Sequence, residues 1–265
     1  MKIGLAGLTP YQVASVRILS AGILLLPFFI KFIGQTPKNK IPIIILSGIL
    51  GNLVPAYLFC IAETRVDSSL AGMLNGLVPL MAILAGFFIF HQKIIKQQLL
   101  GICIGFLGVI LLFTANGIDA GYWYYGLWIV LATICYGINI SLVHNHLKGF
   151  SSIQLGSVAL FFCALFALPV LIYSGFFSLL SGPDVPWKSI GASVTLGIMS
   201  TSVASVLFYI LINKAGGMFA SMVTYALPVV ALMWGLVDGE SISLLQVGCM
   251  LIILTGMYLV NRKKA

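Results

Sequence analysis

Apolar stretches of about 20 residues recur along the whole chain, and that length is what one crossing of a lipid bilayer requires. Hydrophobic residues make up 60% of the chain and charged residues only 8%, a balance outside the range of soluble domains. Because hydrocarbon offers backbone groups no partners, each stretch is expected to be a helix. The predicted fold class is therefore all-α integral membrane, with nine transmembrane helices. The expected spans cover residues 10–32, 41–62, 68–90, 96–114, 121–143, 152–174, 188–212, 217–237 and 244–260.

Basic residues gather in the loops on one side of this map. If nine spans alternate, one face carries ten lysines and arginines and the other face carries three. This asymmetry predicts a cytoplasmic C-terminus and an outer loop at 182–184, with multi-pass insertion in the plasma membrane, the inner membrane of a bacterium. It accounts for the net charge of +8 without a nucleic-acid partner. The ten are Lys31, Lys38, Lys40, Lys93, Lys96, Lys148, Lys214, Arg262, Lys263 and Lys264, and the three are Lys2, Arg65 and Lys188.

The third and eighth expected spans each carry a proline near the middle, preceded by the same A-x-M spacing. These prolines are Pro79 and Pro228. A proline inside a helix removes one hydrogen bond and bends the helix, which would free the carbonyls of Asn75 and Thr224. The pattern predicts a hinge at Pro79 and another at Pro228, at matching depth.

The chain contains an internal repeat. Residues of the first span align with the sixth span at an offset of 142, and later residues align at 149. Five spans separate matched helices, an odd number, so they are expected to cross the membrane in opposite senses. The prediction is two inverted repeats, residues 1–115 with four spans and 121–262 with five, and such repeats are used by secondary transporters with the substrate site at their interface. Aligned pairs are Gln12 with Gln154, Ser15 with Ser157, Val16 with Val158, Pro27 with Pro169, Asn52 with Thr201, Arg65 with Lys214 and Pro79 with Pro228.

Polar residues inside the spans are the candidates for function, because placing them in hydrocarbon is costly and they usually face a cavity or another helix. Arg17 is the clearest intramembrane charge, suited to substrate contact or to an ion pair at a gate. The alternative is that Arg17 snorkels or bonds helix-end carbonyls. For the uncharged candidates the alternative is hydrogen bonding between helices. The predicted substrate-binding residues are Arg17, Asn52, Asn75, Trp128, Asn139, Thr201, Ser205, Tyr209, Thr224 and Tyr225.

Several short motifs occur in a fixed order. Thr9, Pro10 and Arg17 form T-P-(six residues)-R, the A-x-M…P unit occurs twice, a glycine-rich helix begins at Gln98, and a turn contains Gly239-Glu240. In this order the chain resembles the EamA-type branch of the drug/metabolite transporter superfamily, over nearly its whole length. The resemblance implies two five-helix inverted repeats, alternating access, and export or exchange of small metabolites such as amino acids. The chain departs from it by having nine spans rather than ten, and Phe90-His91-Gln92 in place of the first glycine-glutamate turn.

The acidic turn has a structural explanation of its own. Ser243 and Gln246 have capping-box spacing at the start of the last span, so Asp238, Glu240 and Ser241 are expected to serve the turn and that helix N-terminus.

An integral-membrane enzyme is the competing class, with His144 and His146 as its best evidence. Two histidines are too few for a metal site, and the five cysteines show no C-x-x-C spacing, so neither a metal nor a cofactor is expected. No acid–base pair, nucleophile motif or phosphate loop is visible in the sequence. A lipid-handling or sensory membrane protein of the same build is the other alternative.

We therefore expect a secondary transporter that exports a small-molecule substrate across the lipid bilayer by alternating access. The first repeat lacks the helix that precedes its partner segment in the second repeat, so the natural product is expected to begin earlier, by about 20 to 25 apolar residues. The alternative is a nine-helix form that fills the gap as a homodimer.

Overall fold

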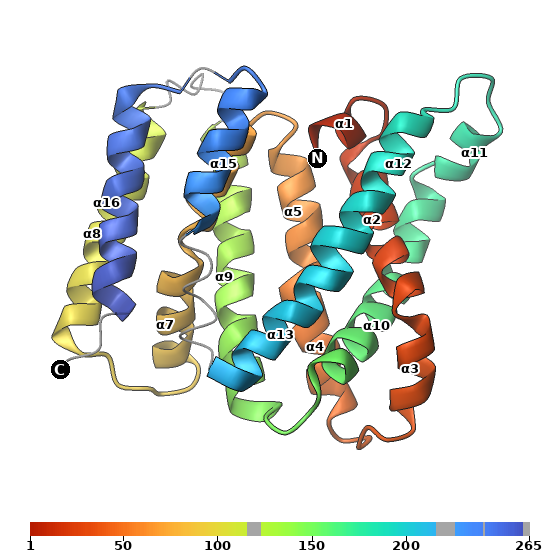
Figure 1. The fold of residues 1–265 in the computed structure, drawn as a ribbon, viewed down its shortest axis with the longest axis horizontal. Coiled ribbons are helices and arrows are strands. Elements are labelled where there is room, and N and C mark those ends of the chain that lie inside the picture. Colours follow the sequence, from red (N-terminus) through yellow and green to blue (C-terminus); the bar gives the residue numbers. More distant parts are fainter. Residues whose placement is uncertain (116–122, 216–225, 241, 262–265) are drawn as a thin grey trace. The chain divides into compact units, whose positions relative to one another are not determined.

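The computed structural model describes residues 1–115, 123–215, 226–240 and 242–261, and in these ranges all regular secondary structure is helical (Figure 1). Six helices are long and apolar enough to cross a membrane, and a seventh span arises if the bent pair α2 (Pro10–Leu24) and α3 (Leu26–Ile33) is one crossing. Two shorter apolar helices cover Ala226–Val237 and Leu244–Val260. The all-helical membrane fold is confirmed for this part of the chain, while the count of nine spans stays a prediction.

The chain divides into two compact units, and each combines segments from both halves of the sequence. Unit 1 is Met1–Thr64 with Leu142–Lys214, and unit 2 is Arg65–Ser141 with Ala215–Ala265, so the division falls within α9 (Trp123–His146). Unit 1 also contains α1 (Lys2–Leu5), α4 (Ile41–Gly48), η1 (Ile49–Leu53), α5 (Val54–Ala62), α10 (Ser152–Tyr173), α11 (Phe176–Leu180), α12 (Trp187–Leu196), η2 (Gly197–Val203) and α13 (Ala204–Ala215). Unit 2 contains α6 (Ser68–Asn75), α7 (Val78–Phe88), α8 (Lys96–Ala115), α15 (Ala226–Val237) and α16 (Leu244–Asn261).

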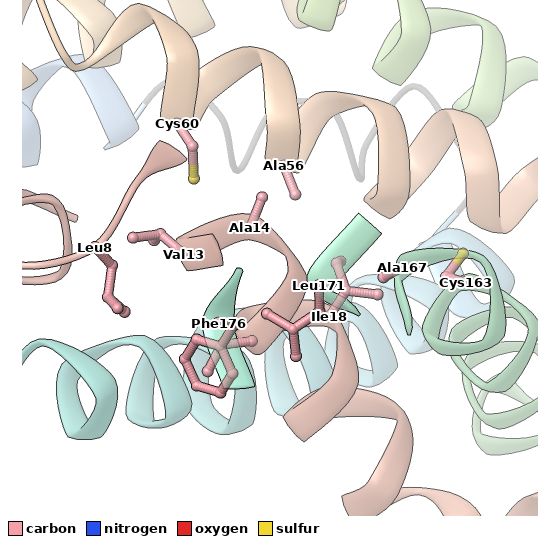
Figure 2. Packing of buried hydrophobic residues seen from close by; sticks show 11 residues of the cluster. Leu8, Val13, Ala14, Ile18, Ala56, Cys60, Cys163, Ala167, Leu171 and Phe176 are labelled. Atoms are coloured by element: carbon pink, nitrogen blue, oxygen red, sulfur yellow. The ribbon is translucent and has the colours of Figure 1, made fainter. Parts of the chain in front are cut away.

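The core of unit 1 forms where α2 packs between α5 and α10. In Figure 2, Ala14 of α2 points toward Ala56 of α5, and Ile18 lies beside Leu171 of α10. All four side chains are buried. The small side chains of Ala14 and Ala56 let α2 and α5 approach closely, which is how membrane helices pack without a hydrophobic driving force between them.

Matching glutamines hold the two ends of the α2–α10 pair. The Gln12 side-chain amide donates to the carbonyl of Ser174, just beyond the end of α10, over 2.9 Å. The Gln154 amide at the start of α10 donates to Thr36 Oγ1, beyond the end of α3, also over 2.9 Å. Because each helix start binds the far end of the other element, α2–α3 and α10 run in opposite directions. A short polar side chain caps each helix start, Thr9 for α2 and Ser151 for α10.

Two spans of unit 1 contain a π-helical segment at their middle. In η1 the N–H of Val54 bonds the carbonyl of Ile49, five residues back, and in η2 the N–H of Ala204 bonds that of Met199. Pro55 follows η1 and cannot donate to the carbonyl of Gly51, so the helix accommodates the lost bond there. No proline stands in η2, where the hydroxyl of Ser202 instead donates to backbone carbonyls.

Unit 2 is held by glycine contacts between helices. A Cβ on Gly101 of α8 would lie 2.6 Å from the carbonyl oxygen of Gly256 of α16, so these two helices touch along their backbones. In Figure 1 they run side by side. On α6, a Cβ at Gly72 would overlap Ala231 of α15. In α9, the Ser141 hydroxyl donates to the carbonyl of Ala82 of α7 over 3.0 Å.

Two local expectations need correction. The third span does not bend at a proline inside a helix: α6 ends at Asn75, Gly76 and Leu77 form a tighter turn, and Pro79 lies in the first turn of α7. An N–H in that turn has no intrahelical partner, so proline costs little there. Similarly, the first expected span is broken by a 58° bend at Leu25, and Pro27 lies in the first turn of α3.

The acidic turn also differs in part from expectation. Ser243 and Gln246 do form the expected capping box of α16, with reciprocal bonds of 3.2 and 2.8 Å. Glu240 also makes a contact that was not expected. Its two carboxylate oxygens accept from the backbone N–H groups of Ser68 and Ser69, at 3.0 and 3.1 Å, and so cap α6. A carboxylate is favoured there because the first N–H groups of a helix are unpaired and carry partial positive charge.

Candidate substrate site in unit 1

Arg17 of α2 bonds a side chain from the middle of another span. Its Nε donates to Oγ1 of Thr201, in η2, over 2.7 Å. Thr201 is the central residue of the candidate span Trp187–Ala215 and is only 2% exposed. Gly197, one helical turn before it, has no room for a Cβ against Ser20 Oγ and the Arg17 carbonyl oxygen. A glycine at this position lets η2 approach α2 closely enough for the bond to form.

The other π-helical segment supplies a second polar pair. Asn52 lies in η1, and its Oδ1 accepts from the hydroxyl of Ser205, in α13, over 2.8 Å. One turn further along α13, the Tyr209 hydroxyl lies 3.3 Å from that of Ser47, in α4. Five of the predicted site residues thus belong to unit 1, where they form the pairs Arg17–Thr201 and Asn52–Ser205, with Tyr209 bonded to a serine.

One polar pair of unit 1 was not among the predicted site residues. The Ser15 hydroxyl, on α2, lies 2.7 Å from that of Tyr57, on α5. Both residues satisfy the criterion used for the other candidates, since they are polar and lie inside apolar spans. The sequence alone could not reveal that they bond each other, because they stand 42 positions apart.

The remaining described candidates lie in unit 2. The Oδ1 atom of Asn75, at the end of α6, is buried and has no hydrogen-bond partner among the described residues. Trp128 of α9 is 38% exposed, whereas Asn139 of the same helix is buried. Pro228, on α15, is buried. Thr224 and Tyr225 lie outside the described residues.

The positive charge of Arg17 has no acidic partner among the described residues. Among the described residues, no Asp or Glu oxygen lies within 4.0 Å of its guanidinium, and the hydroxyl of Thr201 is a neutral partner. The described residues also bring no three His, Cys, Asp or Glu side chains close enough together to hold a metal ion. The arrangement offers one cation, an amide and several hydroxyls, which can bind and orient a polar molecule.

These features define a multi-pass α-helical membrane protein with hydrogen-bonded polar residues at the middle of its spans. The family model for the EamA-like transporter family matches residues 1–114 and 123–262. The chain therefore belongs to the EamA-like transporter family and is a membrane transporter.

Relatives with similar sequences are described as transporters. An uncharacterized transporter of Archaeoglobus fulgidus is 28% identical over all of this chain and 93% of its own length. The uncharacterized inner membrane transporter YedA of Escherichia coli K12 is 27% identical over 93% of this chain and 79% of its own. A crystal structure is similar in fold, with a TM-score of 0.59 at 17% identity, over 96% of this chain and 88% of that one.

Proposed function

We propose that the protein is a secondary transporter that exports a small polar or amphipathic metabolite by alternating access. The polar pairs Arg17–Thr201 and Asn52–Ser205 carry this proposal, because each joins a residue at the middle of one span to a side chain of another helix inside an otherwise apolar unit. Polar groups at that depth are costly and usually belong to a substrate pathway or a helix contact. Both pairs involve a π-helical segment, a feature frequent at functional sites.

The proposal includes the inverted-repeat architecture with nine spans and a cytoplasmic C-terminus, in the inner membrane. Support comes from the reciprocal contacts of Gln12 and Gln154, which place two aligned elements antiparallel. The aligned residues Asn52 and Thr201 both lie in π-helical segments. Pro79, in the first turn of α7, and Pro228, on α15, are proposed as hinges. Asn75, Trp128, Asn139, Thr224 and Tyr225 are proposed to complete the site.

Comparative export tests the function. Cells with and without the chain are compared for release of amino acids, nucleosides, polyamines and cationic drugs into the medium, measured by mass spectrometry. The control is the double variant Asn52→Leu, Thr201→Val, matched for amount in the membrane. We expect at least one compound to accumulate with the wild-type chain and not with the double variant. Equal release by all three cell lines would contradict transport, and movement of lipid alone would indicate a lipid-handling protein.

A further inference from the structure

We infer that Arg17 binds an anionic oxygen group of the transported molecule, a carboxylate or a phosphate. This inference rests on the proposed function and narrows it, because it excludes compounds without a carboxylate or phosphate group as the main substrates. Three observations support it: the unpaired charge, the orientation of the guanidinium, and a matched position in the same unit that does the same packing without a charge.

The charge of Arg17 has no counterion in the described part of the chain. Its single side-chain bond runs to a neutral hydroxyl. That bond also ties the guanidinium to the central residue of the span Trp187–Ala215, rather than to a residue at the end of a span. An arginine held at that depth without an acid is costly, and such charges commonly mark a substrate pathway. An anion would supply the missing charge.

The orientation of the guanidinium suits an incoming anion. A guanidinium has five N–H donors, and the bond to Thr201 uses the one on Nε. None of the described residues accepts from the other four, which are on the two Nη atoms. The two Nη atoms form the planar fork that binds both oxygens of a carboxylate or phosphate at once. Thr201 therefore acts as a positioning residue that fixes one edge of the group.

Helix packing does not account for the arginine. Gly197 of η2 packs against the backbone carbonyl of Arg17. Gly48, at the end of α4, packs in the same way against the carbonyl of Ala159, since a Cβ added at Gly48 would lie 2.9 Å from the Ala159 carbonyl oxygen. Ala159 is the residue that aligns with Arg17 at the offset of 142. The same backbone contact is therefore made once with an alanine side chain and once with an arginine. Since alanine suffices for the contact, the guanidinium serves another purpose.

The test sorts exported compounds by charge and then removes the charge of Arg17. Metabolites that accumulate in the medium of cells with the wild-type chain are identified by mass spectrometry. The same measurement follows for Arg17→Gln, Arg17→Lys and the control Lys38→Gln, which removes one exposed positive charge from a loop. We expect the exported compounds to carry a carboxylate or phosphate. Their export should fall on the order of tenfold or more in Arg17→Gln, fall less in Arg17→Lys and persist in Lys38→Gln.

Each outcome of this test supports or overturns the inference that Arg17 binds an anionic group. Export of only compounds that lack a carboxylate and a phosphate overturns the inference and leaves the transport function standing. Undiminished export of acids by Arg17→Gln overturns it as well. If no compound depends on the wild-type chain, the proposed function fails and the inference fails with it. Size-exclusion profiles of the purified variants report folding. Should Arg17→Gln not fold, the charge class of the wild-type substrates still decides, together with Thr201→Val, which should lower export of acids while Thr201→Ser retains it.

Discussion

The segments η1 and η2 share a backbone geometry but differ in the chemistry they present. Each is a π-helical stretch in the middle of a span, each begins at or after a glycine that meets a carbonyl of another helix, and each carries a buried polar residue that bonds a side chain of another helix. Asn52 of η1 meets a hydroxyl, so its bond is neutral on both sides. Thr201 of η2 meets a guanidinium, so its bond holds a charge.

The difference between η1 and η2 separates the features required for the fold from the feature that we assign to substrate binding. A wider helical turn and a close glycine contact occur at both η1 and η2, so these two features belong to the fold. Of the two segments, only η2 bonds a charged side chain, that of Arg17, so the fold does not require the charge. If the account is right, changes to the shared features should damage both folding and transport, whereas changes to the polar residues should damage transport selectively.

The largest effect is expected at Gly197. Gly197→Ala places a Cβ against the carbonyl oxygen of Arg17 and the hydroxyl of Ser20, and backbone atoms cannot move aside cheaply. The cost of such overpacking is about 1–3 kcal/mol. We expect lower thermal stability in detergent and loss of export. The control is Gly191→Ala on α12, where nothing lies within 4 Å of the new atom. Equal melting temperatures for the two variants would contradict the close contact between α2 and η2.

A smaller, more selective effect is expected from the two polar residues. Thr201→Val leaves Nε of Arg17 without its acceptor, and a hydrogen bond to a charged group contributes about 1.5–3 kcal/mol. Asn52→Leu removes a neutral bond, with a contribution of about 0.5–1.5 kcal/mol. Export should therefore fall more in Thr201→Val than in Asn52→Leu at matched amounts in the membrane. The reverse order would show that the two segments do not differ as described.

Much of the fold follows from the sequence because membrane helices obey simple rules. Apolar length predicts the spans, and the spacing of Ser243 and Gln246 predicts the capping box that begins α16. The alignment of Asn52 with Thr201 places both at corresponding π-helical segments, although the wider turns themselves are not predicted. These features depend on local sequence or on internal comparison, both of which are visible in one chain.

Other features depend on which helices meet, and these could not be predicted. Pro27 and Pro169 align, yet Pro27 begins a new helix after a bend while Pro169 lies inside α10. The consequence of a missing N–H depends on neighbours that re-satisfy the backbone. Likewise, the partner of Glu240 is the start of α6, 171 to 172 positions earlier. The pairing of Arg17 with Thr201, rather than with Asn52, also required the three-dimensional arrangement.

Labelling of a single cysteine tests most directly whether these polar pairs line the substrate pathway. In a transport-competent background without the native Cys60, Cys103, Cys135, Cys163 and Cys249, Ser205→Cys is exposed to a charged, membrane-impermeant thiol reagent. Leu207→Cys, on the same helix and 59% exposed, is the control, because an exposed apolar side chain on a span is expected to face lipid. We expect the cysteine at 205 to react with the reagent and the exported metabolite to slow this reaction. The cysteine at 207 should not react. A cysteine at 205 that never reacts, or whose reaction the metabolite leaves unchanged, would contradict it.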